Sequence, residues 1–204
     1  MVMLLGNDKV FMNALEVARR ASDHYSLYEE QQELLWIHGA RTLARGMDNV
    51  IVELGVCNGK TMLILAALAS KFEAQYYGID IWGLESSKAE CRQLLDDAGL
   101  SGRATLYSED TRKAMDLVPF PIDLLLIDAG HDEENIKADC ENWIPKVRAG
   151  GIVAFHDFDP VDDPERTSAH WAVRYYGNLA TGDESKWETL GFLQGLMIRR
   201  RRPA

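Results

Sequence analysis

The residues best suited to chemistry lie in two short segments. Asp128 and His131 follow an apolar run over residues 121–127, and His156 and Asp157 follow a second run over residues 152–155. Short apolar runs of this kind predict buried strands of a parallel sheet. The carboxyl ends of such strands share the edge at which open α/β sheets bind ligands. The sequence therefore predicts that polar groups from two strands gather at one edge.

The first segment offers a base and an acid. A histidine with a pKa near 6.5 can take a proton at neutral pH, so His131 is a candidate general base. Asp128 could orient the His131 ring, coordinate a metal or bind a cationic group. The simpler alternatives are a local hydrogen bond for His131, beside the start of a helix, and loop anchoring for His156 and Asp157. The acidic residues 132–134 most simply stabilise that helix start.

A glycine turn precedes these segments in the chain. Residues 50–54 form an apolar run rich in β-branched residues. The motif E-x-G-x-x-x-G-x-T begins within this run at Glu53 and contains Gly55 and Gly59. An apolar helix is expected over residues 60–70. Glycine lets the backbone approach a ligand closely, and a helix N-terminus presents free N–H groups to a polar ligand. The alternative is a turn that merely needs glycine. The spacing differs from the G-x-G-x-x-G of dinucleotide-binding domains.

Two further acidic residues end predicted strands. Asp80 ends the strand expected over residues 75–81, where an acidic side chain commonly binds the ribose hydroxyls of an adenosine ligand. The alternative for Asp80 is a helix cap. Asp110 follows the strand expected over residues 103–107 and could cap the next helix, meet an adenine amino group, or do both.

The other elements complete an α/β pattern. Helices are expected over residues 8–21, 28–45, 86–98 and 135–147, the last interrupted near Pro145, and Gly150-Gly151 is expected to break the chain. Residues 160–181 are expected to be loop and then helix, and residues 187–190 and 193–199 a hairpin around Gly191 and Gly195. We expect a Rossmann-like three-layer sandwich whose mostly parallel seven-stranded sheet ends in an antiparallel hairpin. Residues 1–204 are expected to form a single domain, with a helical cap (1–46) on a core (47–204).

Composition narrows the possible partners. The net charge of −10 argues against nucleic acid as a partner. Three cysteines without CxxC spacing fit a reducing compartment. The N-terminus lacks the pattern of a signal peptide, and no apolar run has the roughly 20 residues of a membrane helix. We expect a cytoplasmic protein.

Two stretches resemble class I S-adenosylmethionine-dependent methyltransferases. VELGVCNGKTMLILA resembles the glycine motif of the small-molecule O-methyltransferase group that includes cephalosporin-hydroxylase-like and macrolide-sugar methyltransferases. LLLIDAGHDEENIKADCENWIPKVRAGGIVAFHDF resembles the second signature of that group. The resemblance covers roughly residues 49–157.

The resemblance implies roles for particular residues. The cofactor would be held by Glu53, Gly55, Val56, Asn58, Gly59, Thr61, Asp80, Ile81, Asp110 and Asp128. His131 would be the general base, with Asp128 beside it. A divalent metal, Mg²⁺ or Mn²⁺, would be bound by Asp128, His156 and Asp157. The metal-dependent members have a carboxylate where this chain has His156, and imidazole suits Mg²⁺ less well than Mn²⁺, Fe²⁺ or Zn²⁺.

The expected activity is therefore O-methylation of a small hydroxylated molecule, such as a sugar or a natural-product intermediate. The N-terminal helices and residues 158–181 would shape the acceptor site, and a homodimer through those helices is plausible. Two alternatives stay open: a non-catalytic module that keeps the cofactor fold, and an NAD-dependent oxidoreductase. His24, His38 and His170 have no visible partner in the sequence, and we expect them to be structural or exposed.

Overall fold

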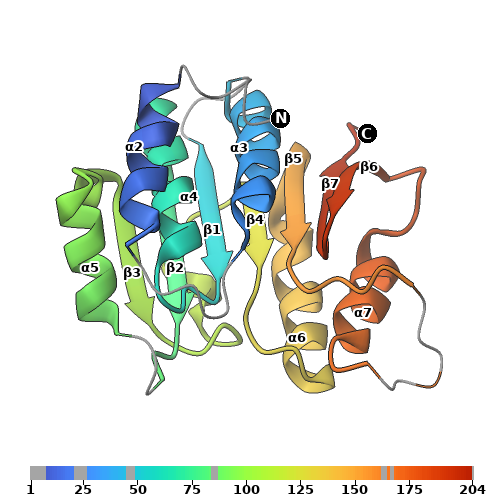
Figure 1. The fold of residues 1–204 in the computed structure, drawn as a ribbon. Coiled ribbons are helices and arrows are strands. Elements are labelled where there is room, and N and C mark those ends of the chain that lie inside the picture. Colours follow the sequence, from blue (N-terminus) through green and yellow to red (C-terminus); the bar gives the residue numbers. More distant parts are fainter. Residues whose placement is uncertain are drawn as a thin grey trace.

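A seven-stranded sheet forms the centre of the computed structural model, which describes residues 8–20, 27–44, 49–83, 87–161, 165 and 168–203. The strands are β1 (Val50–Leu54), β2 (Gln75–Asp80), β3 (Ala104–Ser108), β4 (Ile122–Ile127), β5 (Val147–Phe155), β6 (Trp187–Leu193) and β7 (Leu196–Arg201). Their order is β3-β2-β1-β4-β5-β7-β6 (Figure 1). Strands β1 to β5 pair in parallel, and β7 pairs antiparallel with β5 and β6. The predicted fold class is confirmed.

Helices cover both faces of the sheet (Figure 1). They are α2 (Lys9–Ala18), α3 (Glu29–Leu43), α4 (Lys60–Lys71), α5 (Lys88–Asp97), α6 (Glu133–Trp143) and α7 (Trp171–Thr181). Helices α2 to α5 contribute to one apolar cluster, and α6 and α7 contribute to a second. Strand β4 shows why two clusters form, since its alternating side chains Leu124 and Leu125 enter different ones.

The two N-terminal helices lie over the sheet. Phe11 of α2 and Trp36 of α3 are buried, and their rings lie 4.9 Å apart between centroids. Helix α2 packs on α4, and α3 contacts α4, β4, β5 and β6. The side chain of Gln31 in α3 donates a hydrogen bond to the carbonyl oxygen of Gln194 at 2.9 Å. The simpler prediction, that these helices cover the sheet, agrees with this packing.

Two predicted boundaries are wrong. Strand β5 begins at Val147 and passes through Gly150 and Gly151, which we expected to break the chain. Gly150 takes a positive φ of 80°, and the pairing register between β4 and β5 shifts there, so the glycines accommodate an irregularity within the strand. The hairpin turn lies at Gln194 and Gly195, with φ of 47° and 89°, whereas Gly191 lies inside β6.

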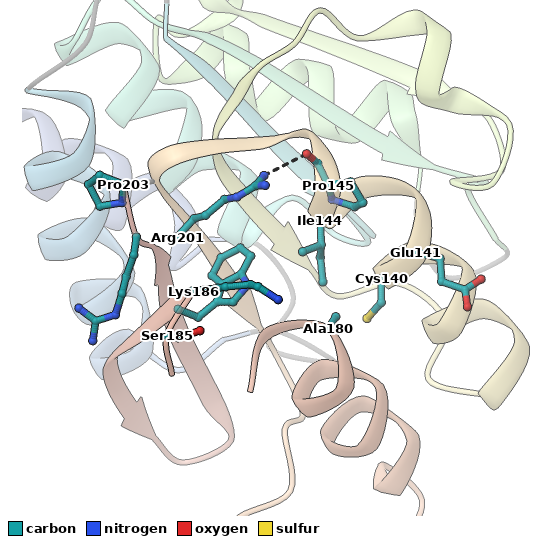
Figure 2. A pocket seen from close by; sticks show the side chains of 11 residues that line it. Cys140, Glu141, Ile144, Pro145, Ala180, Ser185, Lys186, Arg201 and Pro203 are labelled. Carbon is teal, nitrogen blue, oxygen red and sulfur yellow. Dashed lines mark hydrogen bonds between the residues drawn. The ribbon is translucent and has the colours of Figure 1, made fainter. Parts of the chain in front are cut away.

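A cavity of about 510 Å³ lies near the start of β5, between the end of α6, α7 and the hairpin (Figure 2). Arg201 crosses it and donates hydrogen bonds to the carbonyl oxygens of Pro145 and Val147. Burial raises the pKa of the Cys140 thiol in its lining to about 12, so this thiol is a poor nucleophile. This cavity lies away from the predicted site residues.

All three cysteines are free thiols. Within the described residues, no helix is both long enough and apolar enough to cross a membrane.

Candidate functional site

The turn after β1 has two glycines, and the structure gives each a reason. Gly55 has a φ of 86°, and a Cβ placed there would lie 2.1 Å from the carbonyl oxygen of Asp128. Gly59 has a φ of 81° and precedes the first residue of α4. A Cβ on Gly59 would meet the ends of two side chains, Met62 and Cys91. Gly55 therefore lets β1 and the end of β4 approach closely, which brings Asp128 to the turn.

Asp80 fixes this turn from β2. Its Oδ2 atom accepts hydrogen bonds from the backbone N–H groups of Val56 and Cys57, both at 2.8 Å. Its Oδ1 atom accepts one from the N–H of Trp82 at 2.6 Å. The carboxylate thus holds backbone on both sides, a role that neither the ribose nor the helix-cap hypothesis included. A carboxylate oxygen can accept more than one hydrogen bond, so ribose binding by Asp80 stays a prediction.

A cavity of about 240 Å³ lies at the carboxyl ends of β1, β4 and β5. Most of the predicted site residues line it: Glu53, Gly55, Val56, Asn58, Thr61, Asp128, His131, His156 and Asp157. Cys57 and Ala129 also line it, and the sequence did not single them out. The structure therefore brings together the glycine turn and both polar segments, as predicted.

Three of the predicted cofactor residues lie outside this lining in addition to Asp80. Gly59 lies behind the turn, against α5. Ile81 is 75% exposed at the end of β2. Asp110 is bound by the guanidinium of Arg112, which holds the pKa of Asp110 at about 2. Asp110 also accepts the backbone N–H of Arg112, so its side chain closes a turn, and the predicted helix cap is wrong because the next helical turn starts at Ala114.

Glu53 is the most deeply buried carboxyl group of the cavity. Its side chain accepts a hydrogen bond from the hydroxyl of Tyr76. Burial raises the pKa of Glu53 well above its usual range, and the nearby carboxylates of Asp128 and Asp80 raise it further. Tyr76 was missed from the sequence, although the alternation of side chains in β2 places residues 76 and 80 on one face. The cavity therefore gathers three carboxyl groups, those of Glu53, Asp128 and Asp157, and its described lining has no lysine or arginine.

The two polar segments meet around Asp128. The Nδ1 atom of His156 lies 2.9 Å from Oδ1 of Asp128, a hydrogen bond in which the imidazole donates. Nε2 of His131 lies 3.7 Å from the same oxygen, and Nδ1 of His131 lies 3.6 Å from Oδ2 of Asp157. The His131 ring therefore lies between the two carboxylates.

These carboxylates favour the protonated imidazoles. Burial lowers the pKa of His131, but the nearby carboxylates of Asp128 and Asp157 leave it above its ordinary value. The pKa of His156 is raised in the same way, since Asp128 and Asp157 outweigh the effect of burial. The negative charges of Asp128 and Asp157 therefore stabilise the imidazolium forms of His131 and His156.

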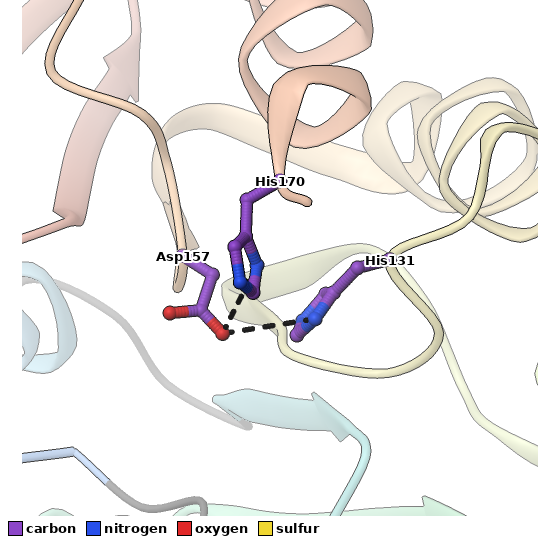
Figure 3. Close-up of side chains that lie close together, drawn as sticks. All are labelled: His131, Asp157 and His170. Carbon is purple, nitrogen blue, oxygen red and sulfur yellow. Dashed lines mark ion pairs between the residues drawn. The ribbon is translucent and has the colours of Figure 1, made fainter. Parts of the chain in front are cut away.

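His170 joins this cluster through a partner that the sequence did not reveal. Its Nδ1 atom lies 3.5 Å from Oδ2 of Asp157, and its ring centroid lies 5.0 Å from that of His131 (Figure 3). The residue directly precedes α7, so the start of this helix lies beside Asp157. No sequence spacing signalled this approach. His38 is buried, and His24 lies outside the described residues.

Two sets of three side chains could hold a metal ion among the described residues. One is the predicted set, Asp128, His156 and Asp157; the other is His131, Asp157 and His170. In each set, the ligand atoms all lie within 4.8 Å of one another. Asp157 belongs to both, and it has a left-handed backbone with a φ of 53°. Such strained backbone is typical of functional sites.

Comparison with known sequences gives one family. Residues 52–158 of the 204 match the family model described as "Methyltransferase domain". A protein of Sinorhizobium fredii (strain NBRC 101917 / NGR234), described as uncharacterized protein y4gI, is 27% identical over 131 residues. The match covers 60% of this chain but only 14% of that relative, so the chain spans a small part of it.

Solved structures share the fold. The O-methyltransferase TomG from Streptomyces achromogenes, in complex with S-adenosylmethionine, superimposes with a TM-score of 0.71 at 16% identity, over 99% of this chain and 95% of that chain. An O-methyltransferase from Bacillus cereus gives 0.70 at 17% identity, over 97% and 92%. An rRNA methylase from Streptococcus thermophilus gives 0.64 at 14% identity, over 87% and 100%. At these identities the likeness is one of fold.

Proposed function

Because the chain belongs to this methyltransferase family, we propose that it transfers a methyl group from S-adenosylmethionine to a hydroxyl group of a small molecule. The cofactor supplies a methyl group on a positively charged sulfur. The acceptor oxygen bonds to this methyl carbon while the carbon–sulfur bond breaks, which leaves S-adenosylhomocysteine. The proteins with known ligands support the choice, since TomG was solved with S-adenosylmethionine and the B. cereus enzyme with S-adenosylhomocysteine.

One observation carries the choice of cofactor. The cavity at the carboxyl edge combines the carboxyl groups of Glu53, Asp128 and Asp157 with a described lining that has no lysine or arginine. A sulfonium and an ammonium group would offset the negative charge of the carboxylates. The cavity also meets the free end of α4 at Thr61, where N–H groups face a ligand. These residues fit the methionine part of S-adenosylmethionine, and Asp80 and Ile81 lie on the side where its adenosine would extend.

His131 is proposed to take the proton of the acceptor hydroxyl. The side chain lines the cavity and is 28% exposed, so it can meet an acceptor as well as the cofactor. Asp128 orients the ring and stabilises the imidazolium that forms, since its Oδ1 atom lies on the Nε2 side. A positioned base of this kind contributes about 10²–10⁴-fold to a rate. The remaining acceleration would come from alignment of oxygen, carbon and sulfur.

A small acceptor agrees with the charge of the chain. The rRNA methylase among the similar structures shows that the fold also serves nucleic acid. A chain with a net charge of −10 repels a phosphate backbone, so we favour a small hydroxylated molecule. Helix α7 and the N-terminal helices are proposed to shape its site. The predicted metal set, the homodimer and the cytoplasmic location remain predictions.

Calorimetric titration with S-adenosylmethionine tests the cofactor. Wild type should bind it with a micromolar dissociation constant, with and without Mg²⁺ or Mn²⁺, and Asp80→Ala should abolish binding. Because Asp80 also holds three backbone N–H groups, Asp80→Asn helps to separate the roles: the amide oxygen can still accept from Val56 and Cys57, but the side chain loses its charge. Asp97→Ala, on the exposed side of α5, is the control and should bind normally.

Two results would count against the proposal. Absence of binding under all conditions would reject S-adenosylmethionine as the ligand. Tight binding of NADH in its place would support the oxidoreductase alternative. Thermal unfolding of each variant without ligand shows whether a loss of binding reflects a loss of fold.

A further inference from the structure

We propose that His131, Asp157 and His170 form a binding site for a transition-metal dication such as Zn²⁺ or Fe²⁺. The ligand atoms would be Nδ1 of each histidine and Oδ2 of Asp157. This set differs from the predicted set of Asp128, His156 and Asp157. The site rests on geometry alone, and its part in catalysis rests on the proposed function.

The distances suit a shared ion. Oδ2 of Asp157 lies 3.6 Å from Nδ1 of His131 and 3.5 Å from Nδ1 of His170 (Figure 3). Two ligands at about 2.1 Å from a tetrahedral Zn²⁺ ion are about 3.4 Å apart, because the angle between them is about 109°. The observed separations are long for direct hydrogen bonds and close to this value. A small inward movement of the rings would complete the geometry.

The hydrogen bonding also distinguishes the two sets. Nδ1 of His170 is buried and has no hydrogen-bond partner among the described residues. A buried polar atom without a partner is costly, and a bound ion would satisfy it. Nδ1 of His156, in contrast, is committed to Asp128 at 2.9 Å. The predicted set would have to break this hydrogen bond to bind an ion through that atom, whereas the new set would break none at His170.

Two of the three ligands lie on or beside backbone that is held by hydrogen bonds. The backbone N–H of His170 bonds to the hydroxyl of Ser168 at 3.1 Å, directly before α7. The N–H of Phe158, next to Asp157, bonds to the carbonyl oxygen of Gly195 at 2.8 Å. The side chains of His131, Asp157 and His170 are 28%, 33% and 37% exposed. The three side chains are thus partly exposed, which lets an ion approach them.

The donor atoms determine the class of ion. Two imidazole nitrogens and one carboxylate oxygen suit Zn²⁺, Fe²⁺ or Co²⁺, whereas Mg²⁺ prefers oxygen ligands. A histidine that gives its lone pair to a cation no longer has one for a proton. His131 therefore cannot be a metal ligand and a general base at the same moment. A bound ion could itself lower the pKa of an acceptor hydroxyl.

Cobalt titration tests the site directly, because Co²⁺ bound by nitrogen ligands has characteristic visible absorption. The full chain is treated with a chelator, dialysed and titrated without any methyl donor. Wild type should bind one equivalent. His170→Ala should weaken Co²⁺ binding by about 100-fold or more, whereas His156→Ala should weaken it by less than the roughly tenfold seen for lost secondary contacts. His38→Ala, a buried histidine elsewhere, should have no effect on Co²⁺ affinity.

Excess Mg²⁺ should leave the cobalt spectrum unchanged. The proposal is overturned if wild type binds no Co²⁺, if Mg²⁺ displaces it readily, or if His156→Ala costs as much as His170→Ala. Circular dichroism of each variant verifies the fold. Since S-adenosylmethionine is absent, these outcomes are independent of the cofactor titration, and either hypothesis can fail without the other.

Discussion

Replacing Gly55 with alanine should damage both the fold and the site. The new Cβ would lie 2.1 Å from the carbonyl oxygen of Asp128. Neither side can move freely, since the N–H of Gly55 bonds to Ile79 at 2.9 Å and the N–H of Asp128 bonds to Leu54 at 2.8 Å. The substitution would push the end of β4 away from β1 and carry the Asp128 side chain with it.

The expected loss of folding stability has two contributions. An alanine at a φ of 86° carries the left-handed backbone cost of about 1–2 kcal/mol. Overpacking against fixed backbone adds about 1–3 kcal/mol. Gly59 isolates the first contribution, because its φ is 81° but its Cβ would meet only the ends of the Met62 and Cys91 side chains. We expect Gly59→Ala to cost about 1–2 kcal/mol and Gly55→Ala about 2–5 kcal/mol.

Urea unfolding at neutral pH gives the free energy of each variant, and calorimetry gives its affinity for S-adenosylmethionine. Gly55→Ala should lose more stability than Gly59→Ala and should bind the cofactor at least tenfold more weakly, because Asp128 moves. Equal costs for the two variants would refute the argument that backbone contact between β1 and β4 requires Gly55. A stable Gly55→Ala variant with normal affinity would refute it completely.

Other predictions concern buried polar groups. Burial raises the pKa of Asp139 from 3.8 to about 6. Because this folded pKa exceeds the unfolded one, stability falls by about 3 kcal/mol as the pH rises through this range, about half of it between pH 5 and 8. In urea unfolding, the free energy of unfolding of Asp139→Asn should fall less between pH 5 and 8 than that of wild type. Glu141→Gln, exposed on the same helix, should follow wild type. The same pH dependence for all three proteins would contradict this prediction. Tyr76→Phe removes the donor to Glu53 and should cost about 1–3 kcal/mol in the same assay, and an unchanged unfolding free energy would argue against that hydrogen bond.

The sequence was sufficient to predict which strand ends come together. Side-chain alternation and apolar runs identify strands, and parallel strands bring their carboxyl ends to one edge whatever the details of the loops. That is why Glu53, Asp128, His131 and Asp157 were predicted together and line one cavity. Strand ends were less predictable: β5 continues through two glycines because a register shift accommodates them.

The sequence could not reveal contacts made by residues outside the strand ends. His170 lies 13 positions beyond Asp157, and its contact with Asp157 depends on where α7 is placed in the fold. Gly55 likewise has a role that the sequence did not reveal, since its Cβ position faces the backbone of Asp128. Asp80 is a similar case. An acidic residue at the end of a strand predicted a ligand contact, but the three hydrogen bonds that Asp80 accepts from the backbone depend on the folded turn and could not be predicted.

The tip of the hairpin has a consequence for the entropy of ligand binding. Three segments distant in sequence converge there, since Gln31 of α3 bonds to Gln194 and Phe158 bonds to Gly195. The backbone beside Asp157 is thereby ordered when the chain folds. A ligand that contacts Asp157 has less loop motion to restrict than it would at an untethered loop, so more of its contact energy remains as affinity. The hairpin, which lies in the sheet and carries no predicted site residue, thus preorganises the site.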